Sequence, residues 1–413
     1  MTLEQYFGES YRYIWSDNWC LDDDRVWFIA GAMNILFCLD LNKKETIVVD
    51  KIPSDGFRQH PKCMKKGNHV ICIPDNGMDI WCYHIPDSSW LRIPVETPGK
   101  IRVSCYHFWL FLNKLYIVSK GLKKILEVDI NLARVINYYN ISSDAEKYLS
   151  ESVLVDDCIY TVSSFPVSIY KFNCRNKQIE RYELLEINDK IQTLCFDGEK
   201  FWLTGFQKRI YIWREDTKKI EIIKDLPEDL GVWNFSGKYK HLINYTLDTL
   251  DIPLFFASVS IGDFVWLIPF QSNRILFVNK NTYVVKDFFL EEEEQTENDV
   301  KTQLLGHKYL LEGVIDNRYI ILFSLKNKCI VEIDTQKFSY TYLDYTLDFE
   351  SKSKIYKIIL SNYYKRKNVI LESEIFAINE LIKQLVQQEN KSEDKNKNTL
   401  YGNSIYIKMQ RDI

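Results

Sequence analysis

A short apolar motif with an isoleucine near its start recurs seven times along this 413-residue chain. The seven copies read NILFCLD, DIWCYHI, KILEVDI, SIYKFNC, RIYIWRE, RILFVNK and CIVEIDT. Their isoleucines, separated by 45, 45, 44, 41, 65 and 55 residues, are Ile35, Ile80, Ile125, Ile169, Ile210, Ile275 and Ile330. A repeat of roughly 40–50 residues is one supersecondary unit that buries its apolar face against its neighbours. The spacing therefore predicts a series of similar packed units rather than one continuous core.

The motif alternates like a β-strand with one strictly buried face. Side chains alternate between the two faces of a strand, so the residues one and three positions after each isoleucine share a face. All of these pairs are apolar: Leu36/Cys38, Trp81/Tyr83, Leu126/Val128, Tyr170/Phe172, Tyr211/Trp213, Leu276/Val278 and Val331/Ile333. In five copies an Asp or Asn follows, as expected for a turn between antiparallel strands: Asp40, Asp129, Asn173, Asn279 and Asp334.

Each motif is preceded by a second apolar segment. These segments read RVWFIAG, HVICIP, KLYIVS, CIYTVS, KFWLTG, FVWLIP and YIILFS. Nearly continuous apolar runs predict strands that are buried on both faces, as in stacked sheets. Most of them follow turn residues, such as Asp197-Gly198 and Asp316-Asn317, and some units show an earlier strand such as IQTLCF. The unit is therefore expected to be a four-stranded antiparallel meander.

Seven such units predict an all-β fold, a seven-bladed β-propeller of four-stranded antiparallel blades over residues 12–345. Six or eight blades are the alternatives, because the outer strands are less distinct in the sequence. A β-sandwich has strands at similar spacing but gives no reason for a motif to recur seven times. A β-solenoid normally repeats at a shorter period.

Three tryptophans test this register. Trp27 and Trp202 each lie eight residues before a motif isoleucine, and Trp266 lies nine before Ile275. We expect them at equivalent positions, each buried between neighbouring sheets. Trp90 stands in a polar, turn-rich segment, PDSSWLRIP, and is expected to tolerate substitution far better than these three.

Two insertions and a C-terminal extension depart from the repeat. Between the fifth and sixth motifs, the added segment carries Trp233, Phe235 and Tyr239, so we expect it to pack against the propeller. Between the sixth and seventh, the acidic stretch from Glu291 to Asp299 reads as a solvated loop. Residues 346–413 form an extension with a short amphipathic helix at about 373–388, whose apolar face comprises Ile375, Ile378, Leu381, Ile382 and Leu385.

The unit, an apolar strand, a short loop, I-x-x-x-[DN] and a turn, resembles the kelch-like, WD-like and quinoprotein-like repeats of the β-propeller superfamily. The resemblance covers about residues 12–345 and implies a fold only. The kelch double glycine, the Trp-Asp pair of WD repeats and the S-x-D-x-G-x-T-W box of sialidases are all missing from the sequence. The first two units and the helical tail also resemble certain uncharacterised bacterial propeller proteins, a likeness that implies no activity.

Composition limits the partners and the compartment. A net charge of −4 gives no electrostatic reason to expect nucleic acid or an anionic membrane surface. No apolar stretch approaches 18 residues, and the N-terminus lacks the pattern of a signal peptide. The ten cysteines are therefore expected to stay reduced, mostly as small buried side chains, in a cytoplasmic protein.

Motifs for catalysis or metal binding are sparse. Two i,i+2 pairs, Cys82/His84 and Cys105/His107, could build a zinc site, but neither C-x-x-C nor H-x-x-x-H spacing supports it. We therefore expect no metal and no cofactor. The chain has neither a G-x-S-x-G elbow nor a glycine-rich phosphate loop, and no catalytic residue is predicted. Paired carboxylates have no sequence signature, so a carbohydrate-active propeller enzyme of glycoside hydrolase or lyase type is the alternative.

The loops between the two central strands of each unit should open on one end of the propeller, which we call the loop face. Propellers usually bind ligands there. Amide and aromatic side chains in these loops suit a sugar or a peptide, because rings stack while amides orient polar groups. The sequence thus predicts a non-enzymatic binding or scaffolding propeller for a protein, peptide or glycan. Its candidate ligand-binding residues are Asn34, Asp75, Asn76, Phe165, Phe206, Gln207, Phe270, Gln271 and Asn327.

Overall fold

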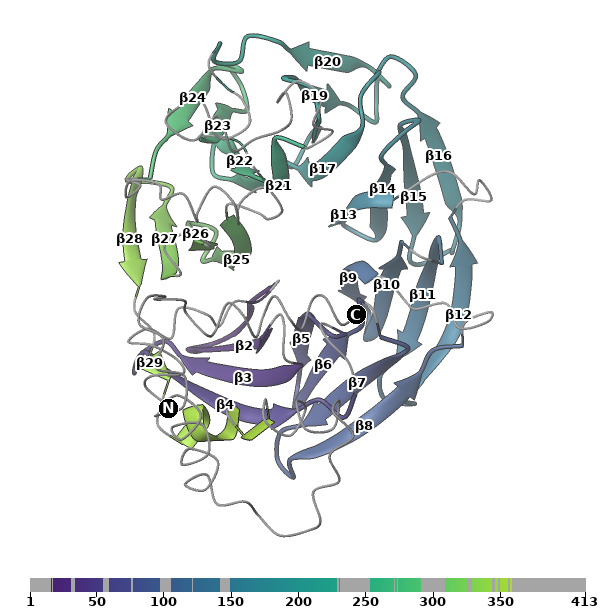
Figure 1. The fold of residues 1–413 in the computed structure, drawn as a ribbon. Coiled ribbons are helices and arrows are strands. Elements are labelled where there is room, and N and C mark those ends of the chain that lie inside the picture. Colours follow the sequence, from purple (N-terminus) through teal and green to yellow (C-terminus); the bar gives the residue numbers. More distant parts are fainter. Residues whose placement is uncertain are drawn as a thin grey trace, which may run out of the picture.

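The computed structural model describes residues 16–358, with gaps at 17, 31–33, 55–58, 76, 97–104, 121, 142–148, 229, 231–252, 271, 273, 291–308, 325–328, 344–345, 348–349 and 356. These residues form seven antiparallel sheets that follow one another around a ring in chain order (Figure 1). The chain is therefore a seven-bladed β-propeller, as the repeat predicts.

Every blade runs from an inner first strand to an outer fourth strand. Blades 1 to 3 contain β1 (Cys20–Asp22), β2 (Arg25–Ala30), β3 (Ile35–Asp40), β4 (Glu45–Lys51); β5 (Lys62–Lys66), β6 (His69–Ile73), β7 (Asp79–His84), β8 (Ser89–Pro94); β9 (Cys105–Phe111), β10 (Lys114–Ser119), β11 (Lys124–Asp129) and β12 (Arg134–Asn140). Blades 4 and 5 contain β13 (Leu149–Val155), β14 (Cys158–Ser163), β15 (Ser168–Asn173), β16 (Ile179–Glu183); β17 (Ile191–Phe196), β18 (Phe201–Gly205), β19 (Ile210–Trp213) and β20 (Ile220–Ile223). Blades 6 and 7 contain β21 (Phe255–Ile261), β22 (Phe264–Pro269), β23 (Ile275–Asn279), β24 (Val285–Phe288); β25 (Tyr309–Ile315), β26 (Tyr319–Ser324), β27 (Cys329–Asp334) and β28 (Ser339–Leu343).

In each blade the turn between the first and second strands and the turn between the third and fourth strands lie at one end of the ring, which we call the turn face. Each of these turns contains a residue with positive φ. Between the first and second strands these residues include Asp23, Gly67, Asn113, Asp156, Gly198, Gly262 and Asn317. Asp, Asn and Gly tolerate this conformation best, which is why the sequence marks these turns clearly. Between the third and fourth strands the residues share no chemistry: Lys44, Ser88, Ala133, Lys177, Lys218, Tyr283 and Phe338.

The turn residues correct the register of blade 1. In blades 2 to 7 the second positive-φ residue lies eight positions after the motif isoleucine, but Lys44 lies nine positions after Ile35. Similarly Asp40, five residues after Ile35, pairs with Arg25, whereas Asp129, four residues after its isoleucine, pairs with Lys114. Leu36 is therefore the counterpart of the other six isoleucines. The sequence does not reveal this one-residue shift of register, because residues 35 to 39 are all apolar and all are buried.

Consecutive blades pack face to face through apolar side chains, and we call each such interface a seam. Between blades 2 and 3, Ile71 and Cys82 pack against Leu115 and Leu126. Similar clusters join the other neighbouring blades from 1 to 7. Because both faces of each sheet are covered, β14 and β18 are buried at every residue. This arrangement explains the continuous apolar runs of the second strands.

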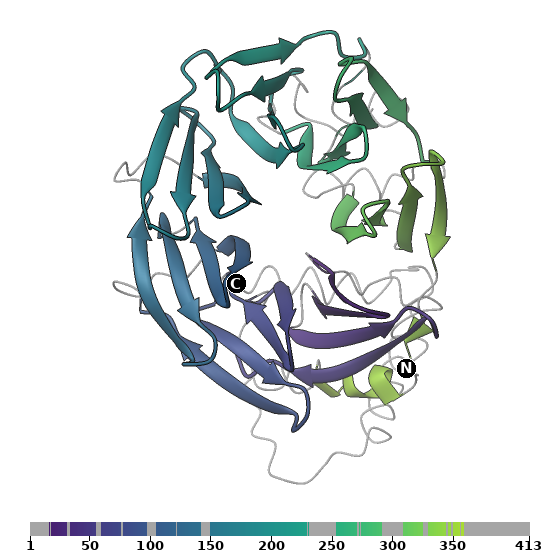
Figure 2. The same ribbon diagram turned by 180° about the vertical axis from the view of Figure 1, so that it is seen from behind.

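Segments from both ends of the chain close the ring at blade 1. The amide of Trp19 donates a hydrogen bond to the carbonyl oxygen of Glu312 in blade 7, and its ring packs against Phe28. After β28, strand β29 (Thr346–Leu347) pairs in parallel with β4, so blade 1 has a fifth strand. A short helix over residues 350–355 follows and lies against the same blade (Figures 1 and 2). There Ser351 Oγ accepts a hydrogen bond from Val48 N, at 2.8 Å, and Ile355 is fully buried.

Three sequence expectations concern residues outside the described part of the chain: the packing of Trp233, Phe235 and Tyr239, the acidic stretch and the helix at about 373–388. Within the described part, no helix has the length and apolar character needed to cross a membrane.

The three tryptophans predicted to be equivalent do share one register position. Trp27 pairs with Cys38, Trp202 with Ile212 and Trp266 with Phe277, each two residues after the reference position of its blade. Their exposed fractions are 4%, 0% and 0%.

Trp90 lies in a strand, although its segment is rich in turn residues. Trp90 belongs to β8, is partly buried against blade 1, and donates a hydrogen bond from Nε1 to Asp50 Oδ2 at 2.7 Å. The polar residues before Trp90 form a turn that ends at Ser88.

Substitution of these tryptophans tests the register. Trp202→Ala and Trp266→Ala should each lower the free energy of unfolding by about 3–5 kcal/mol, because each leaves a cavity between two fully packed sheets. Trp90→Ala should cost clearly less, because its side chain is partly exposed. Chemical denaturation measures the three values, and matched midpoints for the Trp90 and Trp202 variants would contradict the register.

The indole nitrogens give a finer comparison. Trp202 Nε1 donates to Asp197 Oδ2 at 2.7 Å, whereas the buried Nε1 of Trp266 has no hydrogen-bond partner among the described residues. Trp202→Phe loses a hydrogen bond to a carboxylate, and Trp266→Phe removes an unsatisfied donor. The first variant should therefore be the less stable, and the opposite order would contradict this assignment.

Candidate functional site

The predicted ligand-binding residues of the loop face differ in their exposure to solvent, and three of them lie outside the described part of the chain. Asn34 is buried, with 2% of its surface exposed. Asp75, Phe206 and Phe270 are partly exposed, and Gln207 and Phe165 are exposed. The described part of the chain does not include Asn76, Gln271 or Asn327.

Asn34 lies inside the loop face and holds the connector from β4 to β5. Its Oδ1 accepts hydrogen bonds from the backbone amides of Gln59, at 2.9 Å, and His60, at 3.2 Å. From the other side, the amide of Asp75 donates to the carbonyl oxygen of Gln59 at 2.8 Å. Asn34 has a φ of 52°, a conformation in which asparagine is among the favoured residues. Two residues predicted from sequence thus position this connector through its backbone.

His60 is a site residue that the sequence did not single out. It is 1% exposed, and its Nε2 lies 2.8 Å from the carbonyl oxygen of Asp79. A carbonyl can only accept, so Nε2 carries the proton, and Nδ1 can accept a hydrogen bond from Ser54 Oγ at 3.3 Å. Burial lowers the pKa of His60 to about 4, so the ring is neutral at pH 7. A Cβ at Gly77 would stand 3.0 Å from the His60 ring, so a side chain there would press on the histidine.

A cavity of about 380 Å³ opens beside this histidine, within the usual size range of small-molecule sites. The indole of Trp81 forms one wall, and Arg92, directly opposite Trp81 on β8, shares its face of the sheet. Arg92 Nε lies 2.8 Å from Asp79 Oδ2. The cavity is lined by Pro53, Ser54, Gln59, His60, Met78, Asp79, Trp81 and Arg92.

In blade 5 the residue equivalent to His60 holds the loop between the second and third strands. Asp189 lies two residues before the first strand of its blade, as His60 does in blade 2, and is 4% exposed. Its carboxylate accepts hydrogen bonds from the amides of Phe206, at 3.0 Å, and Gln207, at 3.2 Å. Burial raises the pKa of Asp189, and these amide bonds oppose the rise. A Cβ at Gly205 would stand 2.4 Å from a backbone oxygen, so no side chain fits there.

The remaining loop-face residues bring aromatic and charged groups to the surface. Phe165 is 48% exposed, and Lys190 Nζ lies 5.6 Å from the centre of the Phe206 ring. Burial lowers the pKa of Lys120, and the negative charge of Asp75 in the neighbouring blade partly offsets this. The described loop face therefore combines aromatic rings, amides and charges of both signs.

Of the four residues considered for zinc, the structure describes the side chains of Cys82, His84 and His107. Cys82 is fully buried in the seam between blades 2 and 3, while His84 Nδ1 lies 2.7 Å from Asp87 Oδ1. His107 Nε2 lies 2.6 Å from Glu151 Oε1. Among the residues that the structure describes, no three His, Cys, Asp or Glu side chains are grouped as a metal site requires.

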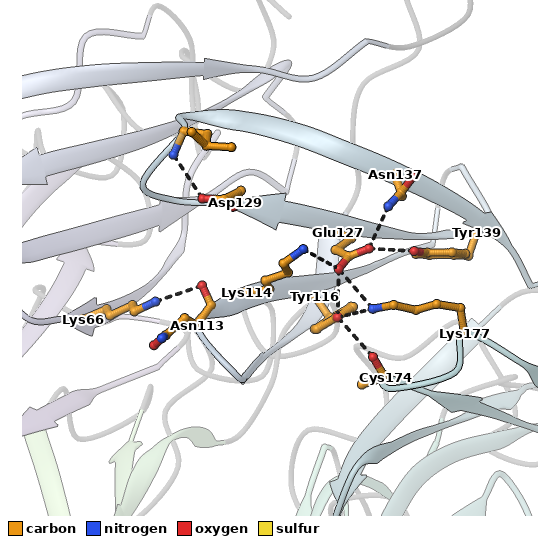
Figure 3. Close-up of polar contacts among 11 residues, drawn as sticks. Lys66, Asn113, Lys114, Tyr116, Glu127, Asp129, Asn137, Tyr139, Cys174 and Lys177 are labelled. Carbon is orange, nitrogen blue, oxygen red and sulfur yellow. Dashed lines mark hydrogen bonds and ion pairs between the residues drawn. The ribbon is translucent and has the colours of Figure 1, made fainter.

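The most strongly perturbed carboxylate lies elsewhere, between blades 3 and 4 (Figure 3). Glu127 is 1% exposed, and its oxygens accept hydrogen bonds from Tyr139 at 2.6 Å, Asn137 at 2.9 Å, and Tyr116 and Lys177 at 3.0 Å. Burial alone would raise the pKa of Glu127, but these hydrogen bonds and the charge of Lys177 outweigh it and lower the pKa to about 2. A perturbed pKa often marks an active site. Here the carboxylate is sealed from solvent and fully bonded.

The next seam repeats this arrangement with the charges exchanged. Lys171 occupies the register position of Glu127, and Glu215 of blade 5 accepts hydrogen bonds from Lys171 at 2.7 Å, Tyr160 at 2.6 Å and Tyr182 at 2.9 Å. A tyrosine pair, an acid and a lysine are thus bonded together at both seams, 3 to 4 and 4 to 5, and at the first seam Lys114 also lies 3.3 Å from Glu127. Two copies at equivalent positions indicate a structural role for Glu127.

Blade 7 offers a matched comparison for Glu127. Glu332 holds the same register position, but burial raises its pKa, and the charges of Arg318 in its own blade and Lys44 in blade 1 only partly oppose the rise. Glu127 should therefore stabilise the fold when ionised, whereas Glu332 should not.

Glu127→Gln should lower the free energy of unfolding by about 3 kcal/mol at pH 7, because Lys177 would be left without its buried counter-charge. Glu332→Gln should be neutral or stabilising. The folded pKa of Glu127 is depressed, so its contribution is full above the unfolded pKa, near 4.3, and is lost as pH falls toward 2. Urea denaturation between pH 3 and pH 7 measures this; an equal loss in both variants, unchanged by pH, would contradict the assignment.

Asn34 supports a separate prediction. Asn34→Ala leaves the amides of Gln59 and His60 without an acceptor and should cost about 1–3 kcal/mol. Asn34→Asp keeps an acceptor at this position and should recover most of the loss. Thermal or urea unfolding of both variants measures the difference, and equal stability of the two would show that the Oδ1 contacts do not hold the connector.

Comparisons with known proteins agree with the architecture. No protein-family model and no curated protein matches the sequence. Solved structures do match the fold. A catalytically inactive virginiamycin B lyase from Staphylococcus aureus with quinupristin is 11% identical, with a TM-score of 0.53 over 75% of this chain and 91% of that one. The computationally designed Ika8 protein is 11% identical, with a TM-score of 0.52 over 82% and 89% of the two chains.

A third similar structure is PorZ, a bacterial surface component of the type-IX secretion system of Porphyromonas gingivalis. It is 11% identical, with a TM-score of 0.51 over 81% of this chain and 38% of PorZ. At such identities the likeness shows the propeller fold alone. An enzyme, a secretion component and a designed protein share it, so function must be argued from the site.

Proposed function

We propose that this protein is a non-enzymatic binding propeller that recognises a protein, peptide or glycan through its loop face. One observation carries the proposal: exposed and partly exposed aromatic and amide side chains stand on loops that buried hydrogen bonds hold rigid. Phe206 and Gln207 are fixed by Asp189, and the connector at Gln59 is fixed by Asn34. Rigid aromatic groups contribute much of the affinity of binding surfaces and lose little entropy on binding.

The carbohydrate-active enzyme is the weaker candidate. Glycoside hydrolysis generally requires two carboxyl groups roughly 5–9.5 Å apart around the scissile bond. Among its described lining residues, the cavity beside His60 contains one carboxylate, Asp79, which is already paired with Arg92. This arrangement supports binding rather than bond cleavage there.

The cysteines support a reducing compartment for this activity. The nine described cysteine side chains are free thiols, and seven of them are buried. Disulfides usually form in oxidising compartments. We therefore retain the cytoplasm as the proposed location.

Comparative capture tests the loop face. Immobilised wild-type protein, Phe165→Ser and Leu132→Ser are exposed to an extract of the source cells, and bound proteins and glycans are quantified by mass spectrometry. Leu132 is the matched control, because it is 58% exposed but lies on the turn face. Ligands held by wild type and by the control should be retained roughly tenfold less by Phe165→Ser, as expected for a central aromatic contact.

Equal unfolding midpoints of all three proteins are required, because they show that the substitutions leave the fold intact. Equal retention by Phe165→Ser and wild type, together with loss in Leu132→Ser, would place binding on the turn face and refute the proposal.

A further inference from the structure

We propose that the cavity between the β4–β5 connector and the outer strands of blade 2 binds a neutral sugar ring, with Trp81 as its aromatic wall and Asp79, Arg92 and Gln59 as hydrogen-bonding groups. This rests on the proposed function and deepens it, because the cavity belongs to the loop face.

The charge balance of the cavity favours an uncharged ligand. Among the lining residues that the structure describes, one is acidic and one is basic, Asp79 and Arg92, and they are joined at 2.8 Å and neutralise each other. His60 is buried and neutral at pH 7. An anion would meet the carboxylate of Asp79, and a cation would meet the guanidinium of Arg92. Neither ion gains a net attraction, whereas a neutral polar molecule can use both groups.

The polar groups that remain unused are of mixed kind. Only Nε of Arg92 is bonded, so its two terminal nitrogens have no hydrogen bond to any described residue. The side-chain amide of Gln59 and the indole nitrogen of Trp81 likewise form none within the described part of the chain. Guanidinium and indole N–H groups only donate, an amide both donates and accepts, and a carboxylate only accepts. Hydroxyl groups of a sugar both donate and accept, so one ring can satisfy all of these groups.

The aromatic wall supplies the apolar contact that a sugar also needs. Trp81 is partly exposed, and its buried part packs against the seam between blades 1 and 2. A sugar ring presents C–H groups on its faces, and an aromatic ring covers such a surface while polar groups at the edge bind hydroxyls. Met78, 45% exposed, adds further apolar surface.

Hydrogen bonds hold the described part of these walls in place. At Gln59 the connector is held by Asn34 from blade 1 and by the amide of Asp75 from blade 2. His60 ties it to the start of β7 through the carbonyl oxygen of Asp79. A preorganised site avoids the entropy cost of ordering loops on binding, which favours recognition of a small ligand.

Saturation-transfer NMR with free monosaccharides tests this directly, because one ring suffices to engage the site. The probes are glucose, galactose, mannose, xylose, arabinose and N-acetylglucosamine, each at 50 mM, with acetate as an anionic probe. Wild-type protein should transfer saturation to at least one sugar and not to acetate. Arg92→Ala and Trp81→Leu should each weaken that sugar's binding about tenfold or more, the loss expected for one charged hydrogen bond or one stacking contact.

Arg181→Ala is the matched control. Arg181 pairs with Tyr170 in blade 4 at the register at which Arg92 pairs with Trp81 in blade 2. The control should bind sugar like wild type. No transfer to any sugar, transfer to acetate alone, or equal binding by Arg92→Ala and wild type would each overturn the proposal.

The two proposals can fail separately. If Phe165→Ser loses its captured ligands while no sugar binds the wild type, the loop face functions without this sugar site. If Arg92→Ala loses sugar binding while Phe165→Ser captures normally, the cavity functions and the broader binding surface lies elsewhere.

Discussion

Face-to-face burial between consecutive blades is the constraint on which the rest of this structure depends. Each sheet is covered on both sides, so the second strand of a blade such as β14 has no solvent-facing residue. A single blade could not bury its apolar surfaces alone, and a ring leaves no outermost blade with an uncovered face. The closure at blade 1 follows from this need. Trp19 before β1 and Ile355 after β28 cover surface there that neither terminal blade covers fully by itself.

Polar groups within the seams obey the same constraint. The buried Glu127 is tolerated because hydrogen bonds and a lysine compensate for its lost hydration, and the neighbouring seam meets the same requirement with Glu215 and Lys171. The loop face is subject to less burial, yet its loops are fixed by side chains from inside, Asn34 and Asp189. Rigid seams and internally held loops together give a surface on which small differences in side chains can select a ligand.

Much of the fold was predictable from the sequence, and the failures have physical causes. The seven motifs fixed the blades, because apolar alternation is a local property of a strand. The register of blade 1 was missed because Ile35 and Leu36 are equally apolar, so either face could be the buried one. The partial burial of Trp90 does not follow from its polar neighbours, because it depends on contacts with Asp50 and other residues of another blade. Of the candidate residues named from the sequence, Phe165 lies at the surface and Asn34 lies inside the loop face, and the cavity at Trp81 was not identified.

The sequence by itself determined the repeated unit, the four-stranded meander and the equivalence of Trp27, Trp202 and Trp266, and it favoured seven blades over six or eight. Each of these follows from residue type and spacing along a single unit. Only the tertiary structure decided what lies between units: the Glu127 network, the closure at blade 1, and the cavity that joins His60 to Trp81 and Arg92. These features depend on side chains that are far apart in the chain or belong to different blades. Their meeting is set by the stacking of whole sheets, which local periodicity does not specify.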